Sequence, residues 1–236
     1  MGLIKIAFFV EGYTEQYFLE KLLLEIFSEK KITIEVQKMK GGKNIPITFS
    51  SIKSTEVIES TKYFVLIYNC GGDSNVKSYI LERRLDLAKA EYSKIVGLRD
   101  IFPDFQRKDI HDLKYFLNYK VPQKEIKIDF IISIMEIESW FLSDSSHFEK
   151  INASLDPVTI TNYLGYDLKS HNTELIDAPA ECLNNIYNLC GEKYEKNKVS
   201  IDRTVKAIDY SEIYFESRKR IKSLDDLILS FEEIFN

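Results

Sequence analysis

The sequence predicts an α/β fold, with a mainly parallel sheet flanked by helices and a helical C-terminal part. Short apolar runs rich in valine, isoleucine and phenylalanine alternate with segments of helical periodicity as far as Met135, as in parallel sheets. From about Asn152 onward the helical periodicity continues and the strand-like runs stop. The length of 236 residues suits one large domain, or one domain with an appendage. We therefore expect residues 1–145 to form the α/β core and residues 146–236 to form a helical extension packed on it.

The predicted strands are short apolar runs that end at polar or turn-forming residues. A strand that is covered on both faces reads as a nearly continuous hydrophobic run, which is the pattern seen here. The runs are Ile4–Val10, Ile32–Val36, Tyr63–Tyr68, Lys94–Leu98 and Ile128–Met135.

The predicted helices show apolar residues at three- and four-residue spacing. Thr14 is a suitable N-cap for the first of them, which runs to Phe27. The segment from Asn44 to Lys62 has a weak pattern, compatible with a short helix around Phe49–Ile58. Further helices are expected at Asn75–Tyr92, His111–Tyr119 and Leu224–Phe235, with several short ones between Pro157 and Gly191.

Composition excludes several classes of protein. The chain carries 32 basic and 37 acidic side chains, for a net charge of −5 and a pI of about 5.4, which argues against a polybasic nucleic-acid binder. Its three cysteines form no CxxC pair and it has three histidines, so a structural zinc site is not expected. No apolar run approaches the roughly 20 residues that span a bilayer, and no P-loop or G-x-S-x-G motif occurs. The apolar run before Glu11 is short for a signal peptide, so we do not expect one. We expect a cytoplasmic protein with no membrane partner.

Carboxylates follow four of the predicted strands. The carboxyl ends of parallel strands meet at one edge of a sheet, where function collects. Acids gathered there repel one another unless a cation is present, and oxygen ligands suit Mg²⁺ or Mn²⁺. Such ions polarise phosphoryl oxygens and activate water, which is the chemistry of phosphodiester cleavage. The acids concerned are Glu11, Asp73, Asp100, Glu136 and Glu138.

Each of these acids also has a structural explanation. Glu11 lies in a Glu-Gly turn, and Asp73 follows two glycines, where an aspartate commonly caps a helix. Glu136 and Glu138 are two residues apart, so on a strand they face one side, which would otherwise be core. A salt bridge to Arg99 or Arg107 is the competing explanation for this pair.

The run Phe9–Leu19 resembles the opening motif of TOPRIM-type nucleases. In that family a hydrophobic strand ends in Glu-Gly, and Thr-Glu then starts the first helix. The specific resemblance is to a bacterial TOPRIM-like family of unknown function, related to OLD-type, RloB-like and AriB-like defence nucleases. Three further segments support it in the expected order, namely Ile95–Pro103, Met135–Trp140 and Asp177–Pro179.

The resemblance implies a TOPRIM-like core and a set of site residues. Glu11 matches the first acid of the family, and Asp100 matches the first aspartate of its Asp-x-Asp motif. The sequence departs from the family at the second aspartate, where it has Phe102, and the next acid is Asp104. The resemblance further implies that Glu136 and Glu138 complete the metal ligands. Lys198 is a candidate to stabilise developing phosphate charge, and its alternative interpretation, which we favour, is an exposed lysine in a charged stretch.

The resulting hypothesis is a Mg²⁺- or Mn²⁺-dependent endonuclease that cleaves DNA or RNA, tRNA included, as the effector of an anti-phage defence system. Its metal ligands are Glu11, Asp100, Glu136 and Glu138, with Asp73 and Asp104 as outer candidates. The resemblance also implies a separate ABC- or OLD-type ATPase partner, and a homodimer is left open. Two alternatives are a degenerate TOPRIM-fold regulatory or scaffold subunit and a phosphotransfer or nucleotidyl enzyme.

Overall fold

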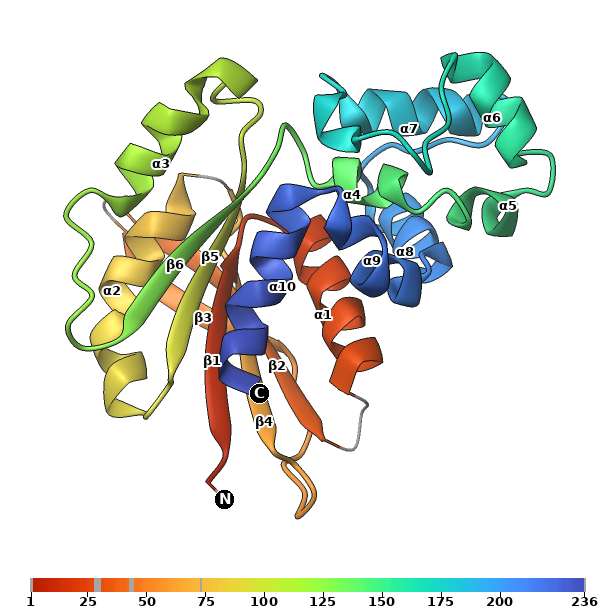
Figure 1. Cartoon of the computed structure of the whole chain (residues 1–236). Coiled ribbons are helices and arrows are strands. Elements are labelled where there is room, and N and C mark those ends of the chain that lie inside the picture. Colours follow the sequence, from red (N-terminus) through yellow and green to blue (C-terminus); the bar gives the residue numbers. More distant parts are fainter. Residues whose placement is uncertain (1, 28–30, 43–44, 73, 236) are drawn as a thin grey trace.

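The computed structural model describes residues 2–27, 31–42, 45–72 and 74–235 and shows a twisted sheet with helices on both faces (Figure 1). Within these residues the sheet has six strands in the order β3-β2-β4-β1-β5-β6. All neighbouring pairs are parallel except β2 with β3. The strands are β1 (Ile4–Val10), β2 (Ile32–Gly42), β3 (Ile45–Lys53), β4 (Tyr63–Asn69), β5 (Lys94–Asp100) and β6 (Lys127–Ser133). The predicted α/β class with a mostly parallel sheet is therefore confirmed.

The helices form two layers and a separate cluster beyond the carboxyl edge of the sheet. In Figure 1, α1 and α10 lie together on one face and α2 lies on the other; α4 to α7 gather beyond the upper edge, and α8 and α9 lie beside α1. The helices before this cluster are α1 (Tyr13–Phe27), α2 (Asn75–Lys89) and α3 (Ile110–Asn118). The remaining ones are α4 (Glu138–Ser143), α5 (His147–Ile151), α6 (Pro157–Leu164), α7 (Pro179–Asn188), α8 (Lys198–Ala207), α9 (Tyr210–Phe215) and α10 (Lys222–Phe235).

The apolar run of β1 shows why the sheet is central. Successive side chains of a strand point to opposite faces, and here both faces are buried. Phe8 packs in the core with α1 and α10, whereas Phe9 packs in the smaller core beneath α2. The first of these cores also contains Trp140 and residues of the C-terminal helices, so both parts of the chain share it.

Close packing of α2 on the sheet depends on Gly97 in β5. A Cβ atom at this position would lie 2.7 Å from Cδ1 of Phe130 in β6 and 2.9 Å from Cδ1 of Ile80 in α2. Real Cβ atoms essentially never show contacts this short, so a larger residue would force the Phe130 and Ile80 side chains to shift. Glycine therefore allows the close packing seen at this position.

The outer edge of β6 is covered in part by a side chain from its own chain. The amide of Gln123 donates to the carbonyl of Ile128 at 2.9 Å and accepts from the backbone N–H of the same residue at 2.8 Å. These are the two bonds that a further strand would make at this residue. The side chain thus protects this part of the strand edge.

The C-terminal helix α10 returns to the sheet and is held there at both ends. Glu174, which is buried, accepts the first-turn N–H groups of Lys222 at 3.3 Å and Ser223 at 2.9 Å. The carboxylate thereby satisfies two donors that have no partner within the helix. At the other end, the hydroxyl of Tyr63 in β4 donates to the carbonyl of Phe235 at 2.9 Å.

Two expectations about local structure are wrong. The segment around Phe49–Ile58 is not helical. Its first part, as far as Lys53, belongs to β3, which pairs antiparallel with β2 and adds an edge strand to the sheet. Thr14 does not cap α1, since the helix already begins at Tyr13 and the threonine lies in its first turn. In the described part of the chain, no helix combines the length and the apolar character that a membrane crossing needs.

Candidate metal centre

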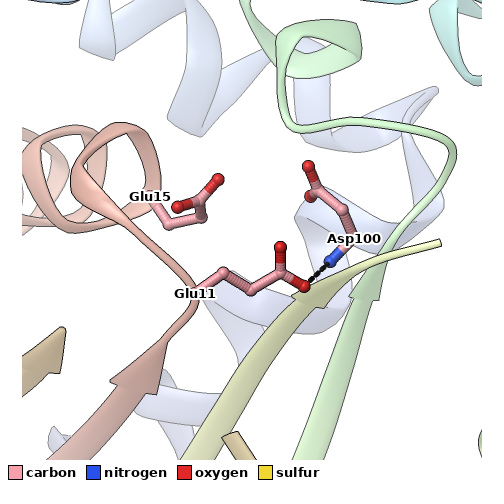
Figure 2. A group of neighbouring side chains, drawn as sticks. All are labelled: Glu11, Glu15 and Asp100. Atoms are coloured by element: carbon pink, nitrogen blue, oxygen red, sulfur yellow. Dashed lines mark hydrogen bonds between the residues drawn. The ribbon is translucent and has the colours of Figure 1, made fainter. Parts of the chain in front are cut away.

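Three carboxylates converge at the carboxyl edge of the sheet (Figure 2). Glu11 directly follows β1, Glu15 lies in the first turn of α1, and Asp100 ends β5. One carboxylate oxygen from each lies within 4.8 Å of the other two, and all three residues are buried. Among the described residues this is the group of potential ligands that could share one metal ion.

Backbone N–H groups hold each carboxylate in place. The N–H of Asp100 donates to Oε1 of Glu11 at 2.7 Å, which links the ends of two neighbouring strands. The N–H of Gly12 donates to Oε2 of Glu15 at 2.8 Å, and the N–H of Ile137 donates to Oδ2 of Asp100 at 3.2 Å. The three side chains are therefore positioned by the fold before any ligand binds.

The electrostatics of this group favour a cation. Burial raises the pKa of Glu15 to about 7, and the nearby Glu138 carboxylate adds to the shift. Burial also raises the pKa of Asp100 well above its usual value, with further contributions from Glu15 and Glu138. Oδ1 of Asp100 is buried and accepts no hydrogen bond within the described part of the chain, although the Ser133 hydroxyl slightly favours the charged form. A divalent ion would satisfy this oxygen and stabilise the ionised carboxylates.

A second pair of acids lies beside the first group and is already neutralised. Nζ of Lys196 contacts Oε1 of Glu136 at 2.8 Å and Oε2 of Glu138 at 3.2 Å. The Tyr194 hydroxyl donates to the other oxygen of Glu138 at 2.7 Å, and the N–H of Ala180 donates to the other oxygen of Glu136 at 3.0 Å. Loss of solvent would lower the pKa of Lys196, but the two carboxylates outweigh this effect and raise it above its usual value.

An open pocket of about 460 Å³ gives access to these side chains. Its lining joins the three converging carboxylates to Glu136 and Lys196, with Phe102 and Pro103 on one side and the glycines at the end of β4 on another. Carboxylate oxygens are the donors that Mg²⁺ and Mn²⁺ prefer, and both ions usually retain several water ligands. The residues present therefore fit a hard divalent cation with one exposed side.

The structure places the predicted site residues differently. Glu11 and Asp100 belong to the converging group, and Glu136 and Glu138 lie next to it, joined through Lys196. Two residues lie outside the group: Asp104 pairs with Arg99 at 2.7 Å, and Lys198 lies over the ring of Tyr13, with its ammonium 5.5 Å from the ring centre. Asp73, which was also expected to bind metal, is outside the described residues.

Glu136 and Glu138 do form salt bridges, as the competing explanation proposed, but their partner is Lys196 and not Arg99 or Arg107. Arg99 instead pairs with Asp104 and lies 3.9 Å from Glu11, while Arg107 pairs with Asp177. The two glutamates also lie after the end of β6 rather than on a strand, because that strand stops at Ser133 and Glu138 begins α4.

Sequence reasoning missed Glu15 and Lys196 as parts of the site. A signal existed for Glu15, because a residue in the first helical turn after a strand end lies close to the strand-end acid. Lys196 has no comparable local signal. It belongs to the charged run Glu192–Lys198, which reads as a solvated loop, and it lies 60 residues from Glu136 in the chain.

Comparison with known proteins yields no family. No family model matches the chain, and no curated protein matches it. One solved structure that matches is described as "the putative cell surface hydrolase from Lactobacillus plantarum WCFS1", with 12% identity and a TM-score of 0.34 over 62% of this chain. Another is the product of gene lin2722 from Listeria innocua, with 9% identity and a TM-score of 0.34 over 64% of this chain. The matched part spans 58% of the length of each of these two proteins.

The identification as a TOPRIM-type nuclease is corrected by these findings. No TOPRIM model matches, and the solved structures that match are not described as nucleases. The site agrees with the correction, because Phe102 replaces the second aspartate of the motif and Asp104 is bound to Arg99. The endonuclease activity, the role in phage defence and the scaffold alternative are withdrawn with the resemblance. A TM-score of 0.34 transfers no activity from the matched proteins to this chain. The ATPase partner, the homodimer and the cytoplasmic location stay predictions.

Proposed function

We propose that the protein is a hydrolase that uses one divalent cation, Mg²⁺ or Mn²⁺, held by Glu11, Glu15 and Asp100. The observation that carries this proposal is the convergence of three buried carboxylates around the unpaired Oδ1 of Asp100, in a pocket open to solvent. Three like charges at this separation are costly unless a cation neutralises them.

The residues of the pocket have separable roles. A bound divalent ion supplies Lewis acidity towards a carbonyl or phosphoryl oxygen and lowers the pKa of water. The backbone contacts of Glu11, Glu15 and Asp100 keep their oxygens in position, so that ligand binding requires little reorganisation. Phe102 and Pro103 line the same pocket and give it an apolar surface beside the carboxylates.

A binding experiment tests the proposal. Titration of the protein with Mn²⁺ by calorimetry should show saturable binding, and Asp100→Asn should weaken it at least tenfold, because it removes a ligand charge. The matched control is Asp86→Asn, which changes an exposed aspartate on α2 paired with Arg83. Its Mn²⁺ affinity should equal that of wild type.

An activity screen follows from the same variants. Wild-type protein should hydrolyse p-nitrophenyl acetate or p-nitrophenyl phosphate in the presence of Mn²⁺, with loss of activity on chelation and in Asp100→Asn. Absence of Mn²⁺ binding to the wild-type protein at millimolar concentration would refute the proposal. Equal affinity in the wild type and Asp100→Asn would place the ion elsewhere.

A further inference from the structure

We infer that the ammonium group of Lys196 occupies the place of a second cation, so that the site binds one divalent ion and not two. This inference rests on the proposed function and concerns the acid pair Glu136 and Glu138. Hydrolytic sites with two metals hold them about 3.5–4 Å apart between neighbouring carboxylates. Here five acids from the ends of β1, β5 and β6 and from α1 lie together, which is a ligand supply typical of two ions.

The position of Lys196 is that of a bound ion. Its Nζ lies between one oxygen of Glu136, at 2.8 Å, and one oxygen of Glu138, at 3.2 Å. The Glu138 side chain is fully buried, so its charge needs compensation from within the protein. No other cation is paired with either carboxylate in the part of the chain that the structure describes.

Three of the four oxygens of the pair accept hydrogen bonds, from the Lys196 ammonium, the Tyr194 hydroxyl and the N–H of Ala180. The fourth, Oε2 of Glu138, is buried without a hydrogen bond among the described residues, but it lies 3.2 Å from Nζ of Lys196. Oδ1 of Asp100 in the neighbouring group is also buried without a hydrogen bond, and Asp100 forms no ion pair with a described residue. The pair that already has a cation and the carboxylate that has none assign the internal cation to the second group and the divalent ion to the first.

The backbone at Lys196 indicates that its position is specified by the fold. Its φ angle is 50°, in the left-handed region that residues other than glycine rarely adopt. The following residues begin α8, with Asn197 as its N-cap, so the loop is anchored on its C-terminal side.

The charge arrangement explains why one internal cation does not suffice for the whole site. Glu136 and Glu138 share Lys196, and Arg99 approaches only Glu11, at 3.9 Å, while it pairs mainly with Asp104. Asp100 and Glu15 are both buried, and neither forms an ion pair with a lysine or arginine in the described part of the chain. A divalent ion is needed for these two groups only.

The test is the stoichiometry of Mn²⁺ binding, measured by calorimetry and by electron paramagnetic resonance at saturating Mn²⁺. Wild type should bind one ion and give the spectrum of an isolated Mn²⁺. Lys196→Met, which keeps an unbranched stem of nearly the same length and removes the ammonium, should bind two ions with a spin-coupled spectrum. The conservative variant Lys196→Arg should bind one, and the double variant Lys196→Met/Glu138→Gln should return to one.

Each outcome decides the inference. Two ions in the wild type would overturn it and leave the proposed hydrolase intact, whereas no ion in the wild type would refute the proposed function itself. One ion in folded Lys196→Met would also overturn it. If Lys196→Met is unfolded without metal, millimolar Mn²⁺ should restore its circular dichroism spectrum, because the second ion replaces the ammonium; failure to restore it would count against the inference.

Discussion

Replacement of Glu15 by glutamine tests whether the buried carboxylates are destabilising in the absence of a cation. Burial raises the pKa of Glu15 from 4.5 to about 7, a shift of about 2.5 units. At 1.36 kcal/mol per unit, the ionised form costs about 3 kcal/mol of folding free energy. Because the pKa is raised in the folded state, this contribution to stability is present below pH 4.5 and is lost as the pH rises through 7. Glutamine is neutral at every pH and can still accept the N–H of Gly12.

Glu15→Gln should therefore be more stable than wild type by about 3 kcal/mol at pH 8.5, and by less than about 1 kcal/mol at pH 5. The assay is urea unfolding at both pH values, with and without Mn²⁺. A saturating ion at 100 times its Kd should add about 2.7 kcal/mol to wild type, and much less to the variant. The control is Glu25→Gln, an exposed position on the same helix. Identical pH dependence of wild type and Glu15→Gln would refute the reasoning, as would equal stabilisation of both by Mn²⁺.

Three further predictions concern the fold. Gly97→Ala should lower the free energy of unfolding by about 1–3 kcal/mol in urea denaturation, because its Cβ would lie 2.7 Å from Phe130; an unchanged midpoint would show that the packing relaxes freely. Glu174→Ala should cost about 1–2 kcal/mol in the same assay and loosen α10, seen as faster hydrogen exchange of the Ser223 amide; unchanged exchange would exclude the capping role. Burial lowers the pKa of His147, so its contribution to stability is present above pH 6.5 and is lost as the pH falls below that value. Unfolding measured at pH 7 and 5.5 should show a loss that His147→Gln lacks, and equal losses would contradict the assignment.

The strands and the strand-end acids were predictable because their signals are local. The run Ile4–Val10 is apolar except for Lys5, and the strand lies in the interior of the sheet with both faces covered. Glu11 and Asp100 follow two such runs, so a parallel sheet necessarily brings them to the same edge. By contrast, β3 could not be recognised. It is an edge strand of mixed serine, threonine and isoleucine, and its structure depends on pairing with β2 rather than on its own pattern.

The partner of Glu136 and Glu138 could not be predicted because it depends on tertiary structure alone. Lys196 comes from the loop before α8, and its residue type is unremarkable in a run rich in lysine and glutamate. Two arginines closer in sequence were the plausible partners by proximity, and both are engaged elsewhere. A short motif resemblance was also insufficient, because a strand followed by Glu-Gly and a helix is a local arrangement that does not determine which ligands complete a site.

The return of α10 to the sheet has a consequence for the order in which the protein acquires its structure during synthesis. Phe231 and Phe235 of α10 belong to the same core as Phe8 of β1, and both pack on Phe27 at the end of α1. The part of this core that α10 covers therefore stays exposed until more than 210 residues after the first strand have left the ribosome, although α1 can pack on the strand earlier. A nascent chain that lacks α10 exposes a broad apolar surface, which is the type of surface that chaperones bind.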